Sequence, residues 1–291
     1  MRVALHDADA TAFPKLALMK ISAVWRAAGH TTYLYQPGAS YDHIFSSKVF
    51  TFTPENAPAN SHLGGYGRGL TACLPDQIEH ACPDYALYGL NYSMGFLTRG
   101  CCYDCGHCFV RRKGGALRPA ADFTEFVRHD TAVFMDNNVL ASEHGIHQIE
   151  KLAAAGIKCD FNQGLDARFI DNAAARLLKR IKWAVPLRLA CDSKDSMPAI
   201  FKAVTVLRKH NVTPSRYPCY LLVKDVQDAA DRVDFLKALY VDPFAQPYLP
   251  PDGTPPTDEQ KMFARWVNMK AEFKSQTWEE YRDRKRGASC L

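Results

Sequence analysis

Residues 95–108 read GFLTRGCCYDCGHC, which places Cys101, Cys105 and Cys108 within eight positions, with Cys102 beside the first. Thiolates are the usual protein ligands of iron–sulfur clusters, and a loop of this length can wrap around one cubane. Three ligands leave the fourth iron without a protein ligand, and an open metal position is where a cofactor or substrate binds. The next cysteine along the chain is Cys159, so a closed site with four thiolates would need a distant partner. We therefore predict metal ligands among these cysteines, in one of two spacings that begin at Cys101 or at Cys102.

Beyond this segment, strand and helix patterns alternate about six times, which is typical of parallel βαβ units. The predicted strands cover residues 93–98, 132–140, 157–161, 187–191, 217–223 and 242–249, and the predicted helices cover 145–155, 172–181, 199–210 and 229–240. Six such units fit a partial (β/α)6 barrel better than a complete eightfold one.

The first 90 residues predict a small Rossmann-like α/β domain. Strands are expected at 3–5, 31–35 and 48–52, with a helix over 16–28 that ends at Gly29, while 54–85 should be mostly irregular. The glycine-rich segment 64–69 lacks the Lys-Ser/Thr pair of a P-loop, so a turn is expected there. Residues 258–284 predict a helical tail. The predicted division is therefore 1–90, 91–250 and 251–291.

Composition supports a soluble globular protein, because 47% of the residues are hydrophobic and 23% are charged. The chain has no apolar run long enough for a membrane span and begins without a signal-peptide pattern. We therefore predict a cytoplasmic protein with no membrane partner, in which clustered cysteines serve metal chemistry rather than disulfides. Two basic stretches, 111–113 and 282–286, could contact an anionic substrate or nucleic acid, although solvated loops and helix ends often carry such charges.

The spacing Cys101-x3-Cys105-x2-Cys108, directly after a strand, resembles the signature of the radical S-adenosylmethionine (radical SAM) superfamily. The resemblance implies a [4Fe–4S] cluster whose open iron binds S-adenosylmethionine, and one-electron cleavage of that cofactor to a 5′-deoxyadenosyl radical. It also implies an external reductant such as flavodoxin or ferredoxin. The residue before the last cysteine is usually a large aromatic in this family; here it is His107, which is expected near the adenine.

The same resemblance directs attention to the carboxyl ends of the strands, where barrel enzymes place their sites. The family's Gly-Gly-Glu stretch is absent here, and Asp136 or Asn137 could replace it. Arg168 could pair with the cofactor carboxylate, or instead form a salt bridge with Asp166 or Asp171. Turn and cap roles are the alternative for all of these positions. The predicted cofactor-binding residues are His107, Asp136, Asn137, Gln163, Arg168, Asp192 and Gln246.

The N-terminal region loosely resembles the cobalamin-binding branch of the superfamily but lacks the Asp-x-His-x-x-Gly motif, so no bound cobalamin is expected. Two other classes of function remain open. Cys102-x2-Cys105-x2-Cys108 begins like a bacterial ferredoxin motif, which would indicate an iron–sulfur electron carrier. Compact cysteine sets also bind structural zinc, which would indicate a zinc-stabilised binding module. The substrate and the final reaction do not follow from the sequence.

Overall fold

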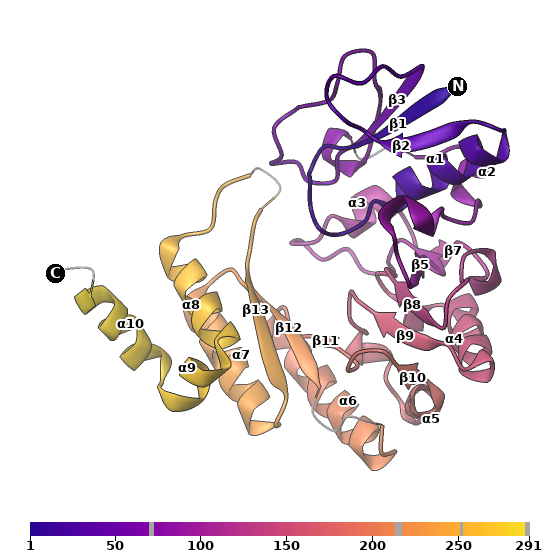
Figure 1. The fold of residues 1–291 in the computed structure, drawn as a ribbon. Coiled ribbons are helices and arrows are strands. Elements are labelled where there is room, and N and C mark those ends of the chain that lie inside the picture. The colour runs from indigo at the N-terminus through magenta and orange to yellow at the C-terminus, as the bar shows by residue number, and fades with distance from the viewer. Residues whose placement is uncertain (70–72, 213–216, 251–252, 289–291) are drawn as a thin grey trace. The chain divides into compact units, whose positions relative to one another are not determined.

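The computed structural model describes residues 1–69, 73–212, 217–250 and 253–288. The chain separates into two compact units, Met1–Cys159 and Asp160–Leu291. Figure 1 shows parallel strands and helices in both. The predicted α/β class is therefore confirmed. None of the helices in the described ranges combines the length and the apolarity needed to span a lipid bilayer.

A parallel sheet of four strands opens the first unit, in the order β2-β1-β3-β4. Its strands are β1 (Arg2–Asp7), β2 (Thr31–Leu34), β3 (His43–Ser47) and β4 (His62–Gly64). The chain leaves β1 for β2 on one side and returns to β3 on the other. The carboxyl ends of β1 and β3 therefore lie next to each other at the point where the winding direction reverses.

Helix α1 (Leu16–Ala27) joins this sheet to the rest of the unit because it is apolar on two faces. Leu18 and Ile21 pack on Leu5 of β1. Met19 faces the other way and packs on Tyr85 and Met94. Residues 1–90 and the strand that precedes the cysteines thus share a buried core, which is why the compact unit continues to Cys159. The helix ends as predicted, with Gly29 in the left-handed region at φ +81°.

The remainder of the first unit carries the cysteine segment. Parallel strands β5 (Ser93–Gly95) and β8 (Thr131–Phe134) pair with each other. A short antiparallel hairpin of β6 (Thr98–Arg99) and β7 (Arg118–Pro119) brackets the cysteines. The other elements are α2 (Asp76–Glu79), α3 (Val110–Gly114), α4 (Glu143–Ala155) and β9 (Lys158–Phe161), which contains the boundary between the units.

The second unit continues the predicted alternation of strands and helices. A parallel sheet has the order β11-β12-β13, and α7 packs on β12 and β13. Its elements are α5 (Asn172–Arg180), β10 (Lys182–Trp183), β11 (Leu189–Ala190), α6 (Met197–Lys209), β12 (Pro218–Val223), α7 (Val226–Ala238) and β13 (Asp242–Pro247). The closure of the strands into a partial barrel stays a prediction.

The C-terminal segment is helical, as expected, but it is interrupted twice. Helix α8 (Asp258–Asn268) packs on β13, because the Asn268 side chain bonds both the amide and the carbonyl of Ala245 at 2.9 and 2.8 Å. A second break comes before Thr277, which caps α10 (Trp278–Ala288) through reciprocal bonds with Glu280. Helix α9 (Lys270–Ser275) lies between the two breaks.

Two strand predictions are wrong in their positions. The strand expected at 48–52 lies earlier, at His43–Ser47. The Asp9 carboxylate accepts the amides of Val49 and Phe50, so these amides do not pair with a neighbouring strand. The strand expected at 132–140 ends at Phe134, and a 3₁₀ turn follows at 139–141.

Candidate metal and cofactor site

The two ends of the cysteine loop meet at its base. Gly100 has φ +78°, and a Cβ on it would lie 2.3 Å from the carbonyl oxygen of Ala116. Cys101 then donates its amide to the carbonyl of Gly115 at 3.3 Å. Only glycine fits the left-handed, crowded position at the start of the loop, so the backbone of residues 101–114 is closed at its base.

The three predicted ligands are half-buried on this loop. The amide of Tyr103 points at the sulfur of Cys101, and the amide of Val110 at the sulfur of Cys108, both at 3.4 Å. Cys108 also donates its amide to the carbonyl of Cys105 at 2.8 Å. Hydrogen bonds from backbone amides stabilise a charged sulfur and tune an iron–sulfur cluster. Two backbone amides of the loop are thus aimed at the sulfurs of its first and third cysteines.

The structure limits which residues could complete the donor set. Among the residues that the structure describes, no three His, Cys, Asp or Glu side chains are gathered closely enough to hold one metal ion. Cys159 is fully buried, and burial raises the pKa of its thiol to about 12. This buried thiol is therefore a poor fourth ligand, and the set consists of the loop cysteines.

Asn138 is a site residue that sequence reasoning passed over in favour of its neighbours. It follows β8 and is 4% exposed. Its side-chain nitrogen lies 3.7 Å from the sulfur of Cys101 and 3.8 Å from that of Cys102. Cys102 itself is exposed. The carboxyl end of β8 thus reaches the cysteine loop, as predicted for a strand-end site, but through the third polar residue of that end.

Asp136 serves the protein's own backbone. Its carboxylate accepts the amide of Leu97 at 3.2 Å and both the amide and the hydroxyl of Thr98. The side chain is 4% exposed, and burial raises its pKa to about 6. Asp136 therefore fixes the segment that leads into the cysteine loop, and its predicted contact with a cofactor stays a prediction.

This raised pKa gives a pH dependence with a definite sign. The folded protein holds the Asp136 proton more tightly than the unfolded chain, so the stabilisation is present below about pH 4 and is lost as the pH rises through about 6. We expect the free energy of unfolding of the wild type, minus that of Asp136→Asn, to fall by about 2 kcal/mol between about pH 4 and pH 7. Urea unfolding of the metal-free proteins measures it. A difference that rises with pH would show that the Leu97 and Thr98 donors keep the carboxylate ionised instead.

Two further predicted residues of this unit, His107 and Asn137, lie near the cysteines. His107 lies on the loop between the second and third ligands, and Asn137 lies between Asp136 and Asn138; both are half-buried. Their predicted contacts with a cofactor stay predictions.

In the second unit, the predicted residues occupy the ends of the strands. Asp192 follows β11 and accepts the amide of Leu222 at 3.1 Å, and Leu222 is in register with Gln246 of β13. Asp192 and Gln246 therefore share the carboxyl-end region of this sheet, with Gln246 exposed. Arg168 forms the salt bridge that was the alternative expectation, with both oxygens of Asp166 at 2.8 and 2.7 Å. Gln163 is exposed and bonds its neighbour Asn162.

Sequence reasoning missed Arg232, which organises the same strand ends. It is 1% exposed on α7, and it donates to the carbonyls of Cys191 and Leu222 at 2.6 and 2.9 Å. Asp228, one turn earlier, balances its charge. An arginine in a helix is ordinarily expected at the surface, and the i, i+4 spacing to Asp228 was the only signal in the sequence.

Comparison with models of protein families and with curated proteins finds no match for this chain.

Proposed function

We propose that the protein is a radical SAM enzyme in which Cys101, Cys105 and Cys108 hold a [4Fe–4S] cluster. The observation that carries the proposal is the loop itself. Three half-buried thiols with this spacing follow a parallel strand, on a backbone closed by Gly100, with the next cysteine buried. The parallel α/β architecture supports the finer proposal of a partial (β/α)6 barrel preceded by a small Rossmann-like domain.

When bound, the cluster would supply the electron that cleaves S-adenosylmethionine to methionine and a 5′-deoxyadenosyl radical. The chain's own residues would position and shield that chemistry. Asn138 contacts the sulfur of Cys101, while Asp136 fixes the entry to the loop. His107 and Asn137 in the first unit, and Gln163, Arg168, Asp192 and Gln246 in the second, are the proposed cofactor-binding residues. Arg168 would have to give up or share its bond to Asp166.

Metal content separates this proposal from its two alternatives. The protein is reconstituted anaerobically with iron and sulfide, and its iron, sulfide and zinc are quantified. Four irons and four sulfides per chain, with an electron paramagnetic resonance spectrum that changes when S-adenosylmethionine is added, are the expected result. A reducible cluster whose spectrum ignores the cofactor would favour the electron carrier, and a colourless zinc protein would contradict the proposal.

The electron donor of this proposal should carry an acidic surface. Residues 99–118 hold five basic residues and one acidic residue, a surplus of four, whereas the whole chain has a surplus of five. Arg112 and Lys113 are exposed on α3, directly after the last cysteine. Complementary charges raise the rate at which partners meet, and salt weakens that effect.

We expect the pair Arg112→Glu and Lys113→Glu to slow cluster reduction by an acidic flavodoxin by about tenfold or more at low salt, with a smaller effect at high salt. Reduction by dithionite should change little. The matched control reverses Lys179 and Arg180, an exposed basic pair at the end of α5. Stopped-flow absorbance measures the rates. Equal slowing in both pairs of variants would contradict a donor surface at α3.

A further inference from the structure

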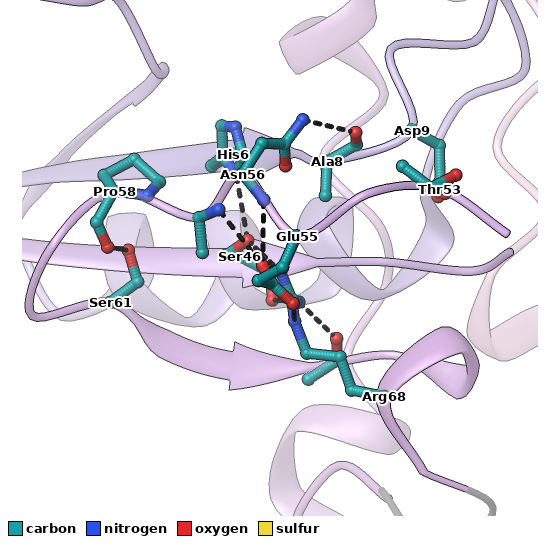
Figure 2. A network of polar contacts seen from close by, with 12 residues as sticks. His6, Ala8, Asp9, Ser46, Thr53, Glu55, Asn56, Pro58, Ser61 and Arg68 are labelled. Atoms are coloured by element: carbon teal, nitrogen blue, oxygen red, sulfur yellow. Dashed lines mark hydrogen bonds and ion pairs between the residues drawn. The ribbon is translucent and has the colours of Figure 1, made fainter. Parts of the chain in front are cut away.

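A polar network ties the glycine-rich segment 64–69 to the first sheet (Figure 2). Arg68 binds both carboxylate oxygens of Glu55, at 2.8 and 2.7 Å, and the backbone carbonyls of Ser46 and Gly64 at 2.9 and 2.8 Å. The hydroxyl of Ser46 meets both Arg68 and the ring of His6. The Arg68 guanidinium lowers the pKa of Glu55 to about 2, so this pair is charged at neutral pH.

The backbone of the turn is also fixed, by close contacts and hydrogen bonds with Lys48. Gly65 has φ +95°, and a Cβ on it would lie 2.2 Å from the carbonyl oxygen of Lys48. The same carbonyl accepts the amide of Gly67 at 2.8 Å, while Lys48 donates its own amide to Gly64 at 3.1 Å. The residue between the two glycines, Tyr66, is therefore presented from a fixed backbone.

Tyr66 contacts both ends of the short helix that follows the cysteines. Its ring stacks on Phe109 with centroids 4.7 Å apart and an angle of 25° between the planes. The ammonium of Lys113 lies 4.1 Å from the centre of the Tyr66 ring. Phe109 is joined directly to Cys108, and the amide of the next residue, Val110, points at the Cys108 sulfur. The Tyr66 side chain, from the turn that follows β4, thus contacts Phe109 and Lys113 on the two sides of Val110, whose amide points at the third thiol.

We infer that the turn Gly64–Gly69 is a clamp on the cysteine loop, and that Tyr66 is the positioning residue that holds Phe109 and thereby Cys108. Arg68 fixes the clamp at the carboxyl ends of β1 and β3. The stack of Tyr66 on Phe109 then restricts the motion of the cysteine loop. Aromatic and cation–π contacts of this kind stabilise the ordered state of two segments that are distant in sequence.

The test uses metal-free, full-length protein, so it does not depend on the proposed cluster. The rate at which iodoacetamide alkylates each cysteine is followed by peptide mass spectrometry. In Tyr66→Ala we expect Cys108 to react about threefold to tenfold faster, the factor expected for the loss of one aromatic pair. Tyr66→Phe keeps the stack and should stay near the wild-type rate.

Tyr41→Ala is the matched control. Tyr41 also contacts the ring of a tyrosine, Tyr35, at a tilted angle of 43°, and lies under a cation, Arg2, in the same unit. Its removal should leave the Cys108 rate unchanged. An unchanged Cys108 rate in Tyr66→Ala would overturn the inference, as would an equal rise at the half-buried Cys82, which would mean general loosening. Tyr66→Leu, which keeps apolar bulk but not the stack, provides the same comparison should the alanine variant fail to fold.

A second consequence rests on the proposed function. In reconstituted protein, Tyr66→Ala should lose iron to a chelator faster than the wild type by a similar factor, and Tyr66→Phe should not. If neither protein takes up iron and sulfide, the proposed function fails while the alkylation result still decides the clamp. If both hold a cluster with equal chelation rates, the clamp does not act on the cluster and the inference is overturned.

Discussion

Cys105→Ala should take up no stable iron–sulfur cluster and should cleave S-adenosylmethionine more than about 100-fold more slowly than the wild type, because loss of a ligand exceeds the effect of losing an outer contact. Cys101→Ala and Cys108→Ala should behave alike. These thiols are the three whose spacing and half-buried positions on the closed loop define the site. The absorbance of the cluster near 400 nm and the iron content, measured after anaerobic reconstitution, check the result.

Two other cysteines of the first unit serve as controls. Cys73 is exposed and lies outside the predicted ligand set, so Cys73→Ala should keep both cluster and activity. Cys102→Ala should keep the cluster as well, although it removes the contact of Cys102 with Asn138. If Cys102→Ala lost the cluster while Cys101→Ala retained it, the ferredoxin-type spacing would be the correct one and the proposed ligand set would be wrong.

Arg232→Met should lower the free energy of unfolding by about 1.5–3 kcal/mol, the range for losing hydrogen bonds from a charged group. The substitution keeps most of the side-chain bulk but leaves the carbonyls of Cys191 and Leu222 without these donors. It also leaves Asp228 without its partner. Urea unfolding monitored by circular dichroism measures the change.

Arg176→Met on α5 is the control, because this arginine is exposed. Surface substitutions of this kind usually shift stability by less than about 0.5 kcal/mol. Equal, small effects in the two variants would contradict the account of Arg232 as the residue that holds the ends of β11 and β12 together.

The elements that depend on local pattern could be predicted from the sequence. Helix α1 has apolar spacing and ends at Gly29, and both features are local. The alternation of strands and helices after residue 93 identified the α/β class for the same reason. Strand positions failed where a distant side chain competes for the backbone. The Asp9 carboxylate accepts the amides of Val49 and Phe50, some 40 residues away, and the sequence near residue 48 gives no sign of these hydrogen bonds.

The candidate site divides in the same way. The cysteines could be predicted because metal ligation imposes a spacing on the chain itself. The choice among Asp136, Asn137 and Asn138 could not, because it depends on which side chain faces Thr98 and which faces the Cys101 sulfur. The role of Tyr66 could not be predicted, because the pattern of its segment indicates only a turn and its partner Phe109 lies 43 positions further along. Contacts of this range carry no periodic signal.

Formation of 5′-deoxyadenosine is the decisive sign of radical SAM chemistry. The reconstituted wild-type protein is reduced with dithionite in the presence of S-adenosylmethionine, and the product is quantified by mass spectrometry. We expect 5′-deoxyadenosine and methionine to form in equal amounts, and neither to form with Cys105→Ala. A wild-type protein that holds a reducible [4Fe–4S] cluster and binds S-adenosylmethionine, yet forms no more 5′-deoxyadenosine than Cys105→Ala, would contradict the proposed function.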